Sequence, residues 1–281
     1  MFYADCWIFQ QGLPMPVVKL WCKWLLWLVF IAPACAHATA QLQLATEQHP
    51  VRIAAEDNWP PFSDENGKGL SSQLVSAAFT RSGYKIETLV VPYARALHYT
   101  AKGKTEACWN VTRQANTERD YLLHQQPLFQ AASSFYFHGF AKNYRSVAEI
   151  PDGTVVGVIL GYEYGDLFEQ HKKRFQLVEV STHPQLISLL QHDKVELAIF
   201  FDEVLAYYLA QPALRQIRLQ KGQLNHVSDI YVAFSRVSPR SQQLADALDK
   251  GLAELRRSGD YQRILQQFKQ NPSAGAVLGR R

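Results

Sequence analysis

The stretch Glu106-Ala-Cys-Trp-Asn-Val-Thr-Arg-Gln-Ala-Asn-Thr-Glu-Arg-Asp120 joins a short apolar segment to a polar one. Its first part, Glu106 to Val111, is apolar between polar ends, which is typical of a strand. Asn116 or Thr117 is a suitable helix N-cap, and Glu118 would follow in the first turn, where a carboxylate suits the helix dipole. The stretch therefore predicts a strand that leads directly into a helix.

Arg119 does not fit the pattern of this predicted helix. A cation in the first turn lies against the positive end of the helix dipole and is mildly unfavourable there. An incoming anion would remove the conflict, because free N–H groups, the dipole and a guanidinium would converge on one carboxylate. The other interpretation is an exposed Arg119 paired with Glu118 or Asp120. The stretch alone leaves both interpretations open.

The same alternation of strand and helix continues on both sides of this stretch. Residue patterns predict strands over 51–56, 84–91, 155–160, 175–180, 195–200 and 229–235, and helices over 70–83, 183–190, 238–258 and 261–268, with two more beginning at Pro92 and Asp202. A second unit of the same kind begins after the run 131–140. This alternation predicts a parallel α/β sheet, in which ligands bind at the carboxyl ends of the strands. Glu56, Trp59 and the residues after Val111 lie at such ends.

The N-terminal segment has the features of a signal peptide. Lys19 and Lys23 precede the apolar run 24–34, which is short for a segment that spans a bilayer. The small residues at 36–40 form two overlapping Ala-x-Ala cleavage sites. We therefore expect residues 1–38 to be removed and the mature protein to be exported to the periplasm.

Two details of this segment leave alternatives open. Translation can start at Met1 or at Met15, because residues 1–14 add nothing that a signal peptide needs. Cys35 raises the question of a lipoprotein, but Ala32-Pro33-Ala34 before it is a poor lipobox, which argues against a lipid anchor. No other apolar run approaches the length of a membrane span.

Composition argues against several classes of protein. The 281 residues carry a formal net charge of +4, without a Lys/Arg cluster of the kind that binds nucleic acid. Of the 4 cysteines, only Cys108 clearly lies beyond the predicted signal peptide, so neither a disulfide framework nor a cysteine metal site is expected. No metal or cofactor is predicted, and we expect a monomer. Residues 271–281 are predicted to form a disordered tail.

Five short motifs occur in order along the chain. They are Val51-Arg-Ile-Ala-Ala-Glu56 with Trp59-Pro-Pro-Phe62, Asn116-Thr-Glu-Arg119, Gly157-Val-Ile-Leu-Gly161, Asp202-Glu-Val204 and Ser258-Gly-Asp-Tyr261. In this order and spacing they resemble the family 3 extracytoplasmic solute-binding proteins, whose best-known members are the polar amino-acid receptors of ABC importers. The resemblance covers the chain from about Val51 to Gln270.

The resemblance implies a two-lobed periplasmic binding protein-like fold of the α/β class. Two α/β lobes are joined by two hinge strands and close on a ligand like a clamp. On this basis lobe 1 is predicted to comprise residues 46–140 and 230–270, and lobe 2 residues 141–229. An ABC permease in the inner membrane is the implied partner, and the ligand is a small polar solute such as an amino acid.

The resemblance also implies roles for individual residues. Arg119 matches the arginine that binds the ligand α-carboxylate, and Asp202 matches the aspartate that takes the α-ammonium from the opposite lobe. Glu56 and Trp59 match the residues that meet the ligand side chain. The turn Gly161-Tyr162-Glu163 matches the one that offers backbone N–H groups from lobe 2.

Several residues depart from the family pattern. Thr112 is the only hydroxyl candidate after the third strand, where such receptors have several. Tyr162 and Glu163 replace small hydroxyl residues after Gly161, which leaves the identity of the ligand open. Arg113 is a second candidate for binding an anion. The histidines lack the spacing of metal ligands and are predicted to be surface residues: His98, His124 and His183.

Three classes of function follow from the sequence. The first is a periplasmic receptor for an ABC importer, without catalytic residues. The second is a periplasmic enzyme of the dehydratase kind on the same scaffold, in which Glu56 or Glu163 would be a general acid. The third is a sensor that reports its ligand to a membrane partner. A permease gene next to the gene of this protein would separate the first class from the third. Turnover of a bound ligand would separate the first class from the second.

Overall fold

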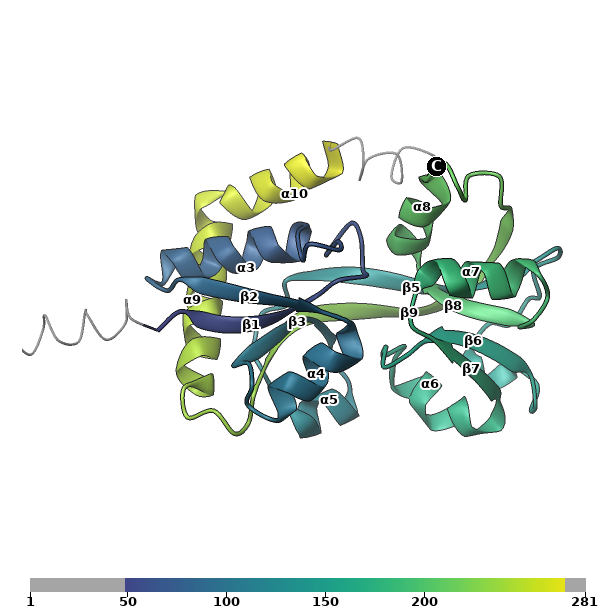
Figure 1. Ribbon diagram of the computed structural model, residues 1–281, viewed down its shortest axis with the longest axis horizontal. Helices are drawn as coiled ribbons and strands as arrows, with labels where there is room; N and C mark the ends of the chain where they lie inside the picture. Colours follow the sequence, from purple (N-terminus) through teal and green to yellow (C-terminus); the bar gives the residue numbers. More distant parts are fainter. Residues whose placement is uncertain (1–48, 271–281) are drawn as a thin grey trace, which may run out of the picture. The chain divides into compact units, whose positions relative to one another are not determined.

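The computed structural model describes residues 49–270 (Figure 1). Three features of the sequence therefore lie outside the described residues: the predicted signal peptide at 1–38, the lipid-anchor question at Cys35 and the predicted tail at 271–281. The first residues of predicted lobe 1, 46–48, also lie outside them.

Strands and helices alternate along the described chain, as the sequence predicts. The strands are β1 (Val51–Glu56), β2 (Ile86–Val91), β3 (Ala107–Thr112), β4 (Leu122–Leu123), β5 (Phe129–His138), β6 (Val155–Ile159), β7 (Gln176–Val180), β8 (Leu197–Phe201) and β9 (Leu219–Phe234). The helices are α3 (Leu70–Arg81), α4 (Tyr93–Ala101), α5 (Ala115–Asp120), α6 (Asp166–His171), α7 (His183–Gln191), α8 (Asp202–Ala210), α9 (Ser241–Ser258) and α10 (Asp260–Gln270), with short 3-10 turns η1 (Val147–Glu149) and η2 (Lys172–Arg174).

One sheet runs through the described residues in the order β2-β1-β3-β9-β5-β8-β6-β7, with β4 paired to β9. Strands β1, β2 and β3 pair in parallel, and so do β6, β7 and β8. Strands β5 and β9 lie between these two sets and pair antiparallel, from Phe129 opposite Ile230 to His138 opposite Leu219. The sheet thus contains two parallel α/β halves, which are joined by a pair of long strands.

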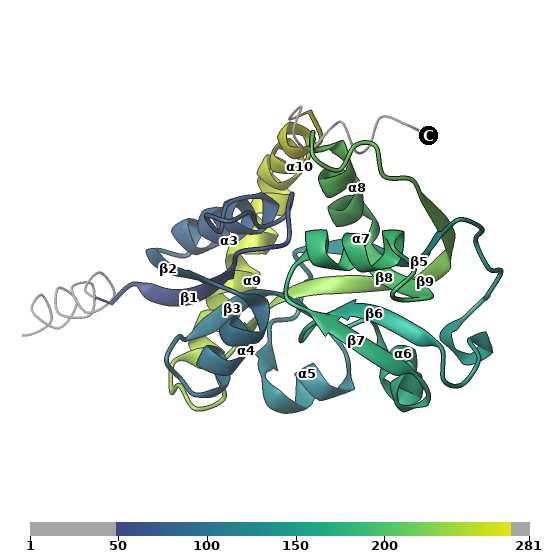
Figure 2. The same cartoon turned by 45° about the vertical axis from the view of Figure 1, so that its right-hand side comes forward.

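We call the half around β1–β3 lobe 1 and the half around β6–β8 lobe 2. In lobe 1, helix α3 covers one face of the strands and α4 the other (Figures 1 and 2). In lobe 2, α7 and α8 lie on one face and α6 on the other. Strands β5 and β9 are the two hinge strands that the resemblance implies; the lobe boundaries at 140/141 and 229/230 stay predictions.

Helices α9 and α3 pack unusually closely. The leucine stripe of α9 is buried, as its helical spacing predicts, and the helix ends at Gly259 in the left-handed conformation, with φ +80°. At Gly251 an added Cβ would lie 2.0 Å from the carbonyl oxygen of Ala78 in α3. The contact therefore requires glycine at this position, because any side chain would push the two helices apart.

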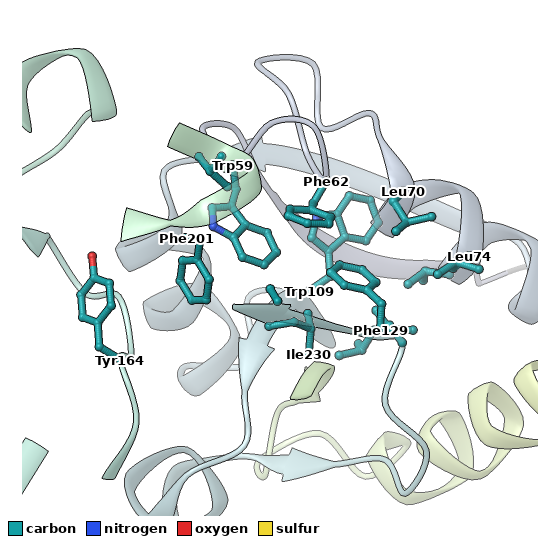
Figure 3. Packing of buried hydrophobic residues seen from close by; sticks show 14 of the residues in the cluster. Trp59, Phe62, Leu70, Leu74, Trp109, Phe129, Tyr164, Phe201 and Ile230 are labelled. Carbon is teal, nitrogen blue, oxygen red and sulfur yellow. The ribbon is translucent and has the colours of Figure 1, made fainter. Parts of the chain in front are cut away.

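An aromatic cluster connects the core of the two lobes (Figure 3). Trp59, in the loop after β1, packs on Phe62 with ring centroids 4.5 Å apart. Phe62 stacks on Phe129 of β5, and Trp59 meets Phe201 at the end of β8, edge to face, with centroids 5.0 Å apart. Because Phe201 belongs to lobe 2, these contacts make Trp59 part of the interface between the lobes.

Two predicted boundaries are wrong in ways that affect the site. Strand β9 begins at Leu219, ten residues before the predicted start at 229. The prediction missed the first half of the strand because these residues are polar and pair with β5 along one edge. Helix α5 begins at Ala115 with Gln114 as its N-cap, rather than at Asn116 or Thr117. The Thr117 hydroxyl accepts a hydrogen bond from the Gln114 amide instead, at 3.0 Å.

Within residues 49–270, no helix combines the length and the apolar character that crossing a membrane requires.

Candidate functional site

A small cavity lies where the strand ends of the two lobes face each other. Its volume is about 10 Å³, close to the smallest that holds one water molecule. We call it the chamber, and it is lined by Glu56, Trp59, Tyr93, Asn110, Thr112, Tyr162, Glu163 and Phe201. The ends of β1, β3, β6 and β8 and the start of α4 contribute these residues, as expected for the carboxyl ends of parallel strands.

Glu56 is a buried carboxyl group that both lobes contact. Its Oε1 accepts a hydrogen bond from the Tyr162 hydroxyl of lobe 2, and its Oε2 accepts one from the Asn110 amide at 3.0 Å. Burial raises the pKa of Glu56 to about 8, although these two hydrogen bonds act in the opposite direction. At neutral pH this carboxyl group therefore holds its proton readily.

Glu163 repeats this arrangement with the lobes exchanged. It belongs to lobe 2, and its Oε2 accepts a hydrogen bond of 2.6 Å from the Tyr93 hydroxyl of lobe 1. Burial raises the pKa of Glu163 to about 8 as well, against the hydrogen bonds from Tyr93 and from backbone groups. Two tyrosine–carboxyl pairs thus cross the interface in opposite directions.

Asn110 has a strained backbone that serves the chamber. Its φ of 69° places a non-glycine residue in the left-handed region, at a register shift between Trp109 and Val111 in the pairing of β3 with β9. This conformation brings the side chain between Glu56 and Ser71, whose hydroxyl donates to Asn110 Oδ1 at 2.5 Å. Backbone strain of this kind clusters at functional sites.

Further contacts hold the lobes together around the chamber. The Asn58 side chain of lobe 1 donates to the Ser181 carbonyl at 3.3 Å and accepts from the Tyr208 hydroxyl at 2.5 Å. On the other side, Gln114 Oε1 accepts from the amide of Gly165 at 3.1 Å. These hydrogen bonds therefore join the two lobes at residues next to the chamber lining.

Two larger grooves adjoin the chamber along the same interface. One has a volume of about 220 Å³ and shares Tyr162 and Glu163 with the chamber. The other has a volume of about 730 Å³ and lies between α4 and the loops of lobe 2, with Asp57 and Arg95 on its lobe 1 side. Within residues 49–270, no group of three or more His, Cys, Asp or Glu side chains is placed to hold a metal ion.

The structure brings five of the predicted site residues together in the chamber: Glu56, Trp59, Thr112, Tyr162 and Glu163. Gly161 lines the adjoining groove of about 220 Å³, and its backbone has φ +80°. A Cβ at Gly161 would lie 3.1 Å from that of Ala94 in α4, so glycine allows the lobes to approach here.

Arg119 is not brought to the chamber. The sequence pattern predicts Arg119 in the first turn of this helix. Because α5 begins at Ala115, Arg119 lies in the last turn instead. Its guanidinium is bound by its neighbour Asp120, at 2.7 Å and 2.8 Å, and 72% of the side chain is exposed. The structure therefore matches the second interpretation of the sequence, an exposed arginine paired with Asp120.

Asp202 also turns away from the chamber. Its carboxylate accepts hydrogen bonds from Ser134 and Tyr136 of β5 and forms an ion pair of 2.7 Å with Lys221 of β9. The prediction missed this partner, because Lys221 belongs to the first half of β9. Neither Asp202 nor Arg119 is among the described residues that line the chamber, so the structure does not bring the predicted clamp for a zwitterion to it.

Arg113 and two of the histidines are structural. The Arg113 guanidinium donates to the His124 carbonyl at 2.8 Å and lies 4.2 Å from the Tyr231 ring centroid. His124 and His183 are buried, which corrects the prediction of surface residues, whereas His98 is exposed. Burial lowers the pKa of both buried histidines, so they are neutral in the fold.

Sequence reasoning missed three residues of the chamber: Tyr93, Asn110 and Phe201. Asn110 had a recognisable signal, since an amide within an apolar strand must find buried partners. Tyr93 follows Pro92 at the end of a parallel strand, which is also a position where ligands bind. Phe201 directly precedes Asp202, and no signal distinguishes it from an ordinary core residue.

The two raised carboxyl pKa values predict that stability falls between about pH 5 and pH 8. In this window the folded protein holds protons that the unfolded chain, with a glutamate pKa of 4.5, releases. The free energy of unfolding should therefore fall with rising pH, by roughly one kcal/mol per pH unit for each group. Urea unfolding at pH 5, 6.5 and 8 measures this slope.

The double variant Glu56→Gln/Glu163→Gln should show a flatter pH profile than the wild type. Glu87→Gln changes an exposed carboxylate and should keep the wild-type slope. The neutral buried histidines, His124 and His183, act in the opposite sense below about pH 6.5 and are present in every variant. An unchanged slope in the double variant would contradict the assignment.

Comparisons with known proteins agree with the fold. The model of the bacterial extracellular solute-binding proteins, family 3, matches residues 51–271. No curated protein matches the chain. Among solved structures, an amino acid ABC transporter substrate-binding protein from Streptococcus pneumoniae bound to L-arginine is 19% identical, with a TM-score of 0.63, and the match covers 82% of this chain and 97% of that one.

Two other solved structures represent different kinds of protein. A histidine kinase sensor domain with similarity to periplasmic binding proteins is 16% identical, with a TM-score of 0.66, over 80% of this chain and 98% of that one. An ancestral amino acid-binding protein, a precursor of cyclohexadienyl dehydratase, is 14% identical, with a TM-score of 0.62, over 78% of this chain and 94% of that one. At these identities the likeness establishes the periplasmic binding protein fold and nothing finer.

Proposed function

The chain belongs to the bacterial extracellular solute-binding proteins of family 3, and from this premise we propose that it is a periplasmic receptor for a small polar solute. In this proposal the solute, an amino acid or a compound of similar size, binds between the lobes and is passed to an ABC permease in the inner membrane. The similarity to an amino acid ABC transporter substrate-binding protein supports the proposal.

The observation that carries the proposal is the chamber between the lobes. Polar groups from both lobes meet there at the carboxyl ends of parallel strands, and the pairs Tyr162–Glu56 and Tyr93–Glu163 cross the interface. A ligand that replaces these contacts would join the lobes itself, and closure would exclude water from its polar groups. A chamber of about 10 Å³ requires the hinge strands to open before a solute enters.

A thermal-shift screen tests the proposal directly. The protein is purified from the periplasm, refolded to remove any bound compound, and screened against amino acids, small peptides, amines and organic acids. A ligand present at about 100 times its dissociation constant should add roughly 2.7 kcal/mol to the free energy of unfolding. Uptake of the same compound by cells with and without the protein then tests the importer role. Binding without any effect on uptake would contradict that role.

A second candidate function, an enzyme on this scaffold, is favoured by one observation. Glu56 and Glu163 are buried, and both have a pKa of about 8, which suits a general acid at neutral pH. Mass spectrometry of each bound compound after incubation with the protein separates the two functions. A product that forms with wild type but not with Glu163→Gln would support the enzyme, and an unchanged compound would support the receptor.

Arg119→Ala is expected to change the affinity for the bound solute by less than about threefold. The guanidinium is largely exposed and is bound by Asp120, so its removal leaves the chamber unchanged. Isothermal titration calorimetry measures the two dissociation constants. A loss of tenfold or more would show that Arg119 reaches the solute in another arrangement of the lobes, as the family resemblance implies.

A further inference from the structure

The chamber has a distinctive chemical lining. Four of its residues are aromatic, Trp59, Tyr93, Tyr162 and Phe201, and two are carboxylic acids from opposite lobes, Glu56 and Glu163. Asn110 and Thr112 complete the lining, and no Lys, Arg or His side chain is among the described residues that line it. The aromatic rings are in mutual contact: the centroids of Tyr93 and Tyr162 are 5.2 Å apart, and those of Trp59 and Phe201 are 5.0 Å apart.

Each carboxyl group of the chamber faces a neutral donor from the other lobe. The Tyr162 hydroxyl donates to Glu56, and the Tyr93 hydroxyl donates to Glu163 at 2.6 Å. The charged neighbours that act on these carboxyl groups are acids: Asp57 and Glu163 act on Glu56, and Glu169 acts on Glu163. Among the described residues, neither carboxylate therefore has a cationic partner that would stabilise its charge in this buried position.

Two buried polar atoms of the lining have no partner among the described residues. They are the Thr112 hydroxyl oxygen and the Trp59 indole nitrogen, and both residues are at least 97% buried. A buried polar group without a hydrogen bond destabilises the fold, because it has lost its contacts with water and gained none in return. These atoms, together with the strained backbone of Asn110, indicate a site that is built to receive a polar molecule.

We propose that the chamber binds a small organic cation without a carboxylate, such as an amine or a guanidinium, with its charged nitrogen between Glu56 and Glu163. The lobes open to admit the ligand, as a chamber of about 10 Å³ requires, and the apolar part of the ligand then packs among the four rings. This inference rests on the proposed function, because it specifies the class of solute that the receptor takes. It replaces a zwitterion held between Arg119 and Asp202, which the structure places outside the chamber.

Charge and ring chemistry both favour a cation in this position. Its N–H groups would replace the hydroxyls of Tyr162 and Tyr93 as donors, and its charge would supply the partner that the two carboxylates lack. A cation over an aromatic face is also attracted by the negative charge at the face of the ring. A ligand carboxylate would instead enter next to two acids without a cation, which is strongly unfavourable in a buried site.

Pairs of compounds that differ only in a carboxylate test this inference. The probes are agmatine with arginine, histamine with histidine, tyramine with tyrosine and cadaverine with lysine. They are titrated into the refolded protein without the predicted signal peptide, at pH 7.5, and the heat of binding is measured by calorimetry. We expect at least one amine to bind at least tenfold more tightly than its parent amino acid. Its binding should release protons, because the cation lowers the pKa of both carboxyl groups, so the measured heat should depend on the buffer.

Every outcome of these titrations decides a question. The inference is overturned if each amino acid binds as tightly as its amine, or if no amine binds at 1 mM. If an amino acid or an organic acid binds in place of the amines, the inference of a cationic ligand is wrong, but the proposed receptor function stands. If a bound amine is converted to a product, the proposed receptor function is wrong, but the inferred class of ligand stands. Glu87 is exposed and does not line the chamber, so Glu87→Gln should bind the preferred amine as wild type does.

Discussion

Glu56→Gln is expected to lower the affinity for the bound solute by about 30-fold to about 5000-fold. Glu56 is 1% exposed and is the acid of the chamber that both lobes contact. Removing one member of a desolvated charged pair costs on the order of 2–5 kcal/mol, which converts to this range of dissociation constants. Glutamine has nearly the same shape, so the change removes the charge and keeps the packing.

Calorimetry on three proteins measures this effect. Wild type and the control Glu87→Gln should bind alike, whereas Glu56→Gln should bind weakly or not at all. The melting temperature of Glu56→Gln without solute should not fall at pH 8, because burial raises the pKa of this carboxyl group and so costs stability at that pH, and the variant removes this cost. Binding within threefold of wild type would show that Glu56 does not contact the solute.

Trp59→Ala is expected to lower the free energy of unfolding by about 3–5 kcal/mol. The indole is 2% exposed and contacts Phe62 and Phe201, which belong to different lobes. Its removal leaves a cavity in the aromatic cluster, which the rigid strand ends cannot close. For a chain of this size such a loss lowers the melting temperature by roughly 6–20 °C.

Trp59→Phe is the matched control for this variant. It keeps an aromatic ring in the cluster, and it loses no hydrogen bond within the protein, because the indole nitrogen has no partner among the described residues. Its cost should be clearly smaller than that of Trp59→Ala, because it removes fewer atoms and leaves a smaller cavity. Urea unfolding measures both variants. A loss below 1 kcal/mol for Trp59→Ala would show that this ring is dispensable for the interface between the lobes.

The order of strands and helices follows from local sequence patterns. Apolar runs such as 155–160, the leucine stripe of α9 and the stop at Gly259 all predict the observed elements, because strand and helix periods differ. The predicted parallel sheet also places ligands at strand ends, and this rule brings Glu56, Thr112 and Glu163 into the same region. These parts of the fold and the site need no knowledge of distant contacts.

Other parts of the site depend on residues that are far apart in the sequence. Asp202 follows a strand, as predicted, but Tyr136 of β5 and Lys221 of β9 bind its carboxylate and turn it away from the chamber. His183 is polar, yet it is buried because Phe200 and Tyr208 lie against its ring. No local pattern reports such neighbours.

The sequence by itself determined the α/β class, the family and the strand ends at which a solute can bind, because these depend on local periodicity and on short motifs. Only the tertiary structure decided which charged groups face each other. It turned Arg119 and Asp202 toward Asp120 and Lys221, and it joined Glu56 and Glu163 to tyrosines of the opposite lobes. The physical reason is that the direction of a side chain, and the burial that shifts its pKa, are set by the groups that the folded chain places around it.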